Sequence, residues 1–248
     1  MKPLTALYQN RTLSGLQVRH QRVPGTTGSR VVLVSDIHAR DDWFSRPCVV
    51  ELVAAINRVE RVDAVLLLGD YVGDDVRAID WAAEELGHLT APTYAVLGNH
   101  DHWTDSERVT RALRRNKVDV LTNASSQLDT GLWLAGIDSC WDGDPDPERA
   151  FHRIPDDEPT VVLGHEPFLA TMHQRYLHVA GHTHHGQIRI PPFAEFLARR
   201  TYPEYSQPYP RGLYHRAPQS WVYTTAGVGF STVSIRFNCP PEIVVLDL

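Results

Sequence analysis

Short apolar runs that end in glycine or a polar residue recur along the whole chain. They are rich in Val, Leu and Ile, and each is closed by a turn-forming or polar residue, which is typical of buried β-strands. The pattern predicts strands at residues 31–35, 64–68, 93–97, 132–137, 160–163, 177–180, 187–190, 221–225, 232–237 and 243–248.

Apolar residues at helical spacing lie between the early strands. Pro47 stands near the start of the first such segment, where a missing N–H group costs little. Thr104 and Glu107 have the spacing of a capping box, and basic residues fill the end of that segment. These patterns predict helices within residues 46–60, 75–89 and 104–116.

The order of these elements predicts the fold class. Strands and helices alternate in the first half of the chain, whereas the last third is mostly strand. This order indicates βαβ units with parallel strands, joined by a second sheet rich in antiparallel pairs. We therefore expect a mixed α/β (α+β) fold, a four-layer αββα sandwich of two mixed β-sheets flanked by helices. Because neither a repeat nor a low-complexity linker interrupts the chain, we expect a single domain over residues 1–248.

Composition and charge exclude several classes of protein. The 248 residues are 42% hydrophobic and 22% charged, as in an ordinary globular protein. The formal net charge is −6, and proteins that hold nucleic acid usually present a basic face, so we expect no nucleic-acid partner. No apolar run approaches the roughly 20 residues that a transmembrane helix needs. The first residues lack the apolar core of a secretory signal, and the three cysteines are widely spaced, so we expect a cytoplasmic protein.

Polar residues with metal-binding side chains follow the ends of most predicted strands, where α/β folds bind their ligands. These residues are Asp36 and His38, Asp70, Asn99, His100 and Asp101, His165, and His182 and His184. Carboxylate, imidazole and amide groups bind divalent metals. Residues two apart in an extended chain point the same way, so Asp36 and His38 are expected to face one site. The same holds for His182 and His184. A buried carboxylate at Asp70 is costly unless a cation compensates it.

This ordered set of motifs resembles the calcineurin-like metallophosphoesterase superfamily. The motifs are D-x-H, G-D, G-N-H-D, G-H and G-H-x-H, and they run from residue 36 to residue 184. The later stretches GHTHHGQIRIP, YPRGLY and CPPEIVVLDL further resemble the bacterial branch of YkuE- and YaeI-like phosphodiesterases. His185 stands where that branch usually has a glycine.

The resemblance implies a metal centre and a reaction. One metal would be held by Asp36, His38 and His184, and a second by Asn99, His165 and His182. Asp70 would bridge the two divalent ions, for which Mn, Fe, Zn and Co all fit the ligand types. A hydroxide between the metals would attack phosphorus.

The resemblance also implies a role for the pair that follows Asn99. His100 would donate a proton to the leaving oxygen or stabilise charge on the phosphoryl group. Asp101 would orient that imidazole through a hydrogen bond.

Substrate contacts are expected from residues beside this set. His102 and His185 lie next to it in the sequence, and Arg211 lies in the aromatic, arginine-rich segment 191–218. That segment is either a substrate wall or a proline-stiffened loop packed on the sheet. We expect the remaining histidines to be surface or structural residues, namely His20, His88, His152, His173, His178 and His215. Asp138 is expected to be a loop carboxylate, and Glu166 either supports the site or is solvated.

These inferences favour a dinuclear metal-dependent phosphoesterase. Its partner would be a small-molecule phosphoester, a phosphodiester or pyrophosphate of nucleotide- or lipid-linked type. A nuclease or protein phosphatase of the same superfamily and a non-catalytic protein-binding scaffold stay open as alternatives. The sequence leaves oligomeric state and peripheral membrane contact open.

Overall fold

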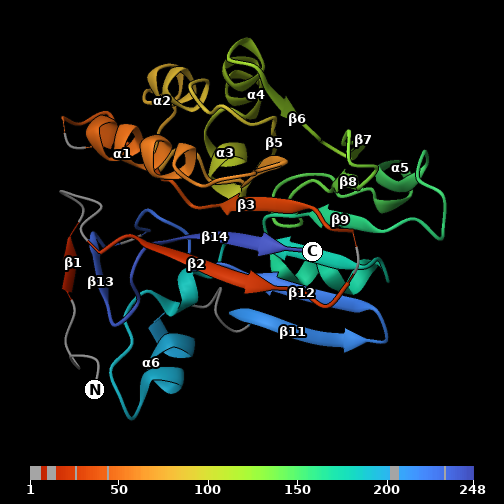
Figure 1. Ribbon diagram of the computed structural model, residues 1–248. Helices are drawn as coiled ribbons and strands as arrows, with labels where there is room; N and C mark the ends of the chain where they lie inside the picture. The colour runs from red at the N-terminus through yellow and green to blue at the C-terminus, as the bar shows by residue number, and fades with distance from the viewer. Residues whose placement is uncertain (1–6, 10–14, 26, 44, 202–206, 232) are drawn as a thin grey trace.

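Two six-stranded β-sheets form the centre of the protein in the computed structural model (Figure 1). The structure describes residues 7–9, 15–25, 27–43, 45–201, 207–231 and 233–248. Strand order is β2-β14-β3-β4-β5-β6 in the first sheet and β11-β12-β10-β9-β8-β7 in the second. A separate pair joins β1 (Leu7–Gln9) to β13 (Ile235–Phe237). The expected sandwich of two mixed sheets is confirmed.

The first sheet carries four consecutive parallel strands. They are β3 (Arg30–Val34), β4 (Ala64–Leu68), β5 (Thr93–Val96) and β6 (Val118–Val120). β14 (Glu242–Asp247) returns from the end of the chain and pairs antiparallel with β3 and parallel with β2 (Gln17–Arg22). β3, β4, β5 and β6 therefore end at the same edge of this sheet, whereas β2 and β14 run in the opposite direction.

The second sheet is parallel at its centre, so the expectation of a sheet rich in antiparallel pairs is wrong. Its strands are β7 (Ala124–Gln127), β8 (Trp133–Gly136), β9 (Thr160–Leu163), β10 (Leu177–Ala180), β11 (Gly212–Ala217) and β12 (Ser220–Thr224). The three central pairings are parallel, and only the two edge pairings are antiparallel. Parallel neighbours need long crossovers, which here contain helical segments that the sequence pattern did not reveal.

The helices in the described part of the chain are α1 (Ser45–Asn57), α2 (Ile79–Leu86), α3 (Asn99–Thr104), α4 (Ser106–Arg115), α5 (Pro147–Phe151) and α6 (Ala194–Thr201). α1, α2 and α4 cover the outer face of the first sheet, and α5 packs on the outer face of the second. Two 3₁₀ segments, η1 (Pro167–Met172) and η2 (His184–Gly186), follow β9 and β10. α1, α2 and α4 lie together on one side of the molecule (Figure 1). None of the described helices has the length and apolar character that crossing a bilayer requires.

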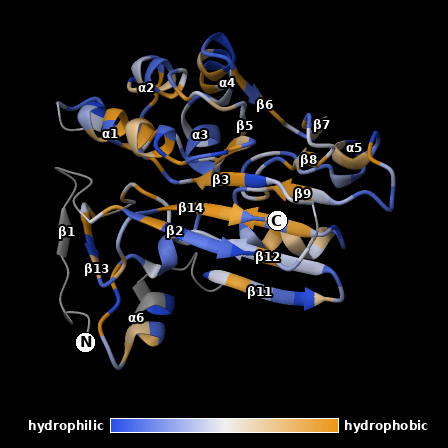
Figure 2. Ribbon diagram, viewed as in Figure 1, coloured by the Kyte–Doolittle hydropathy of each residue, from blue (hydrophilic) through white to orange (hydrophobic). Residues whose placement is uncertain are grey.

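The alternation of side chains along each inner strand builds the core. In β4, Val65 and Leu67 pack toward α1, α2 and α4, whereas Leu66 and Leu68 pack against the second sheet. A strand that is buried on both faces is apolar at every position, and β4 is fully buried along its length. In Figure 2, β3 and β14 are accordingly hydrophobic, while the edge strand β2 is largely hydrophilic.

Several local expectations are wrong at turns and edges. Residues 187–190 do not form a strand, because Gln187 has φ of 45° and only Ile188 makes a bridge, to Phe237. The strand expected over 232–237 is reduced to β13, and Thr232 lies outside the described residues. Thr104 ends α3 and does not cap the next helix, since the carboxylate of Asp105 accepts the N–H of Arg108 at 2.9 Å. The segment 191–218 contains α6 and all of β11, and its residues 202–206 lie outside the described part.

Candidate metal centre

Loops at the carboxyl ends of five parallel strands converge on one buried cluster. β3 leads to Asp36 and His38, β4 to Asp70, β5 to Asn99, β9 to His165, and β10 to His182 and His184. All seven side chains that the sequence pattern assigned to metals come together here, and each residue is buried. The cluster therefore draws on both sheets, and only the packing of one sheet on the other assembles it.

The backbone reaches the cluster in a different way from the one expected. Asp36, His38, Asp70, His182 and His184 all have positive φ, between 45° and 65°. This is the left-handed region, which costs a non-glycine residue of order 1–3 kcal/mol and is concentrated at functional sites. The pairs Asp36/His38 and His182/His184 are therefore not in the extended chain that was expected. Each pair still converges on one site, but left-handed turns bring its side chains there.

Two glycines permit the close approach of these loops. A Cβ atom on Gly98 would lie 2.2 Å from Oδ1 of Asp70 and 2.7 Å from its backbone nitrogen. A Cβ atom on Gly181 would lie 1.9 Å from Oγ of Ser35 and 2.5 Å from Oδ2 of Asp36. No side chain fits at either position without moving the buried carboxylates.

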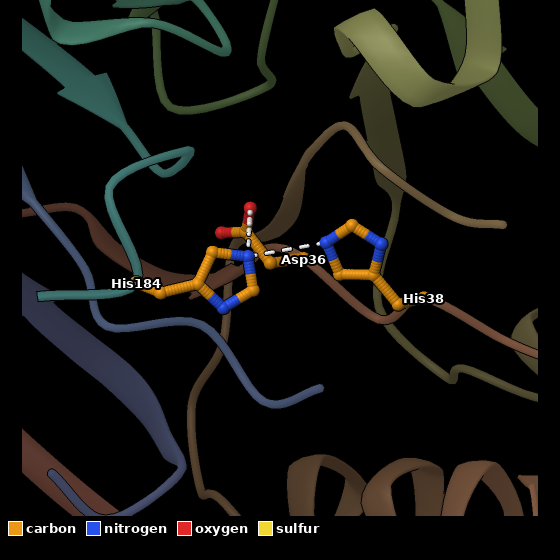
Figure 3. A group of neighbouring side chains, drawn as sticks. All are labelled: Asp36, His38 and His184. Carbon is orange, nitrogen blue, oxygen red and sulfur yellow. Dashed lines mark hydrogen bonds and ion pairs between the residues drawn. The ribbon is translucent and has the colours of Figure 1, made fainter. Parts of the chain in front are cut away.

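Asp36, His38 and His184 form the first group of potential ligands (Figure 3). Nε2 of His184 lies 3.3 Å from Oδ1 of Asp36 and 3.1 Å from Nε2 of His38. In Figure 3 dashed lines join the imidazole of His184 to the Asp36 carboxylate and to the imidazole of His38. Ligand atoms around one divalent ion with bonds of about 2.1 Å are separated by roughly this distance.

A second group adjoins the first and shares a carboxylate with it. Asp36, Asp70 and His165 offer ligand atoms close together, with Nε2 of His165 3.2 Å from Oδ2 of Asp70 and 4.0 Å from Oδ1 of Asp36. Asp70 also reaches back to the first group, because its Oδ2 lies 3.5 Å from Nε2 of His38. Oδ1 of Asn99 and Nδ1 of His182 lie 3.0 Å apart. That spacing suits two ligands of one cation as well as a hydrogen bond.

The cluster contains buried nitrogen atoms that lack hydrogen-bond partners. Nδ1 of His165 donates to the carbonyl of Leu68 at 2.6 Å, which leaves its Nε2 directed into the cluster. Neither this Nε2 nor the Nε2 of His182 has a hydrogen-bond partner among the described residues. Metal-bound histidines commonly donate their other N–H group to a carbonyl in this way. The residues present therefore fit a divalent cation by donor type, by spacing and by unpaired donor atoms.

Electrostatics within the cluster keep the carboxylates ionised. Burial opposes the charge on Asp36, but His184 and His165 outweigh burial and lower its pKa. Burial likewise opposes the charge on Asp70, where His165 and His38 lower the pKa. Burial holds the pKa of His38 well below its ordinary value and lowers that of His182 to about 3. Against the opposing effect of burial, Asp70 raises the pKa of His165 well above its ordinary value, so this imidazole releases a proton when it ligates a cation.

His100 borders the cluster with one ring nitrogen available. Its Nδ1 donates to the carbonyl of Gly73 at 3.1 Å, which leaves the lone pair on Nε2. Its backbone N–H donates to Oδ1 of Asp70 at 3.0 Å, and its ring lies 4.6 Å from that of His38. The ring belongs to a third group of potential ligands with His38 and Asp70. His100 is thus fixed at the edge of the cluster and is only half-buried.

Asp101 does not hydrogen-bond His100, so that expectation is wrong. Its carboxylate is fully buried and accepts the backbone N–H groups of Asp70, Tyr71 and Gly98, each at 2.9 Å. Burial and the nearby Asp70 carboxylate raise the pKa of Asp101 to about 7. The side chain joins the loop after β4 to the loop after β5, while the carbonyl of Gly73 orients His100.

The three residues expected to contact substrate make different contacts within the protein. Nε2 of His102 bonds Oδ1 of Asp138 at 2.8 Å, and this bond raises the pKa of His102 against the opposing effect of burial. Asp138 is therefore more than a loop carboxylate. Nε2 of His185 donates to the carbonyl of Thr224 at 2.8 Å, so this ring nitrogen already has a partner within the protein. Arg211 is half-exposed and pairs with Glu195 of α6 at 3.1 Å.

Two buried charged residues support the site without direct sequence signals. Arg236 is fully buried, and its guanidinium donates to the carbonyls of Gly229 and Ala226 at 2.8 Å and lies 3.1 Å from Nδ1 of His184. An arginine within a predicted strand was the only available hint. Glu166 is also buried, where it accepts the Ser139 hydroxyl and the Cys140 N–H group, so it is not solvated.

A buried Asp, His and Asn cluster at the strand ends of a two-sheet sandwich is the arrangement of a metal-dependent phosphoesterase. The sequence profile described as calcineurin-like phosphoesterase matches residues 29–186. The chain belongs to this family, which confirms the resemblance.

Relatives extend the match over most of the chain. It is 30% identical to the phosphodiesterase YaeI of Escherichia coli, a match that covers 88% of this chain and 82% of YaeI. It is 28% identical to the metallophosphoesterase YkuE of Bacillus subtilis, over 90% of this chain and 80% of YkuE. A metallophosphoesterase of Helicobacter pylori is 29% identical over 88% of this chain, but the chain spans only 59% of that relative's length.

Proposed function

We propose that this protein is a phosphoric ester hydrolase that uses two divalent cations to cleave a phosphodiester or pyrophosphate bond of a small molecule. The observation that carries the proposal is the buried pair of adjoining ligand groups, which share Asp36 and contain imidazole nitrogens without hydrogen-bond partners among the described residues. Membership of the family supports the metal dependence, and YaeI is named as a phosphodiesterase.

We assign the ligands to two cations as the family resemblance implies. Asp36, His38 and His184 would hold one cation, and Asn99, His165 and His182 would hold the other. Asp70 lies within reach of both groups, 3.5 Å from His38 and 3.2 Å from His165, and joins them. When bound, such a pair of cations lowers the pKa of a water molecule and neutralises charge on the phosphate.

His100 acts on the substrate from the edge of this centre. Because its Nδ1 is bonded to Gly73, its Nε2 is the atom that faces the reacting phosphoryl group. Protonated at Nε2, it donates to the leaving oxygen as the P–O bond breaks. Asp101 keeps the Asp70 and Gly98 loops in place for this geometry. His102 lies on the same helix, and its bond to Asp138 through Nε2 favours the imidazolium, whose Nδ1 provides a donor for a non-bridging oxygen.

The test compares metal content and turnover in matched variants. The protein is stripped with EDTA, reloaded separately with Mn²⁺, Fe²⁺, Zn²⁺ or Co²⁺, and assayed on aryl monoester, aryl diester, cyclic nucleotide and sugar-nucleotide pyrophosphate substrates. His100→Ala is expected to bind both metals and to lose a factor of about 100 or more in kcat. Asp70→Asn is expected to lose bound metal as well as activity.

His88→Ala serves as the matched control, because His88 is exposed and its nearest charged partner is Glu85 on α2. Equal metal content in the wild type and Asp70→Asn would refute the shared-carboxylate assignment. Absence of hydrolysis by the reloaded wild type on every substrate would refute the proposed function.

A further inference from the structure

Two half-exposed tryptophans lie directly against the cluster. The ring of Trp103 is 4.6 Å from that of His100, and the ring of Trp141 is 4.7 Å from that of His182. Trp103 is 54% exposed and Trp141 is 43% exposed. Large aromatic side chains on a surface mark binding sites when they gather around a functional group.

The two tryptophans come from separate elements that hydrogen bonds fasten together. Trp103 belongs to α3, and its Nε1 donates to the carboxylate of Asp142 in the loop that carries Trp141. His102, also in α3, is bonded to Asp138 at the start of the same loop. The two rings are therefore held in position before any substrate arrives.

The start of this loop is also anchored on its buried side. The buried Glu166 accepts the N–H group of Cys140, and the Ser139 hydroxyl accepts the N–H group of Trp141 at 3.3 Å. A rim that is fixed in this way loses little conformational entropy on binding, so its aromatic area contributes fully to affinity.

We propose that Trp103 and Trp141 form an aromatic rim that receives a planar ring carried by the phosphoester, such as an aryl group or a nucleobase. This inference rests on the proposed function and names its substrate class. Indoles recognise planar rings by stacking, which depends little on the identity of the ring and is strong enough to be measured as a rate ratio. Each indole touches a histidine of the site, so a ring attached to the reacting phosphate lies within reach of both.

The test uses three diesters with the same p-nitrophenolate leaving group: the phenyl, cyclohexyl and methyl esters of p-nitrophenyl phosphate. The phenyl and cyclohexyl groups have similar size, but only phenyl is planar. For the metal-loaded wild type, kcat/KM is expected to be about tenfold higher for the phenyl ester than for the cyclohexyl ester. Trp141→Ala or Trp103→Ala is expected to reduce this ratio to about one, whereas Trp→Phe at the same position retains most of it.

A binding readout separates recognition from turnover. Inhibition constants of phenylphosphonate and cyclohexylphosphonate should show the same preference and the same loss in the alanine variants. Trp43→Ala is the control, since Trp43 is 79% exposed and lines a surface groove with Val50 and Trp81. It is expected to leave both ratios unchanged.

Each outcome bears on the inference separately from the proposed function. Hydrolysis of the methyl ester by the metal-loaded wild type establishes the reaction, and its absence counts against the proposed function itself. With hydrolysis established, a phenyl-to-cyclohexyl ratio near one in the inhibition constants of the phosphonates, which carry no second ring, overturns the aromatic rim. A ratio retained in both alanine variants overturns it as well. A preference for the cyclohexyl ester that the alanine variants abolish also overturns the aromatic rim, and would indicate recognition of a non-planar apolar group.

Discussion

A buried histidine pair outside the metal centre predicts that the protein loses stability in acid. The backbone N–H of Arg175 donates to Nδ1 of His173, so the proton of that ring lies on Nε2 and is donated to Nδ1 of His178 at 3.1 Å. His178 is fully buried on β10, and burial lowers its pKa from 6.5 to about 3 despite an opposing effect of the Glu166 backbone. Both histidines are structural, as expected from the sequence, and both stay neutral in the folded protein.

The sign and size of the effect follow from the difference in pKa between the two states. Below pH 6.5 the unfolded chain takes up a proton at His178 that the folded chain does not, so the free energy of unfolding falls with pH until about pH 3. Each pH unit in this window corresponds to about 1.4 kcal/mol, so His178 contributes a loss of about 2 kcal/mol at pH 5.

The assay is urea denaturation followed by circular dichroism at pH 7.5, 6 and 5, with EDTA present to remove metal effects. His178→Gln carries no titrating group at this position. Its free energy of unfolding should therefore fall by about 2 kcal/mol less than that of the wild type between pH 7.5 and pH 5. The titration of the cluster histidines is common to both proteins and cancels in this difference.

A control isolates burial as the cause. His20→Gln replaces an exposed imidazole on β2 and controls for the loss of one histidine as such. If His178→Gln and the wild type lose equal stability between pH 7.5 and pH 5, His178 takes up a proton in the folded chain and the reasoning from burial is refuted.

Three further predictions concern the metal centre. Gly98→Ala places a methyl group against Asp70 and should destabilise the protein by about 1–3 kcal/mol and weaken metal binding. Gly73→Ala, whose added Cβ meets only ordinary contacts, should change neither the free energy of unfolding in urea nor the metal affinity in calorimetric titration. Arg236→Gln removes the guanidinium beside His184 and should weaken metal binding by about 10- to 100-fold, and unchanged affinity would show that the contact is only structural. Removal of metal with EDTA should lower Tm, because metal at a free concentration of 100 times Kd adds about 2.7 kcal/mol to the free energy of unfolding. A Tm that excess divalent metal does not restore would contradict the site.

The sequence by itself determined the inner strands and the chemical identity of the site. β4 and β10 are apolar because both faces are covered, so their positions are visible in the pattern of residues. Edge strands such as β2 and β11 are half-exposed and polar, and their residues resemble loops, so the pattern missed them. The candidate ligands were visible because carboxylate, imidazole and amide groups at strand ends have few other common explanations.

Only the tertiary structure decided how these residues act together. Asp101 lies next to His100 in the chain, yet its carboxylate turns to three backbone N–H groups, and Gly73 orients the imidazole instead. Arg236 lies 52 positions from His184 in the chain and touches its ring. Sequence adjacency cannot report either contact, because successive residues of helix α3 point about 100° apart and the packing of two sheets brings distant residues together. The residue types and their order fixed the chemistry, and the fold decided which of them share a proton, a carboxylate or a substrate.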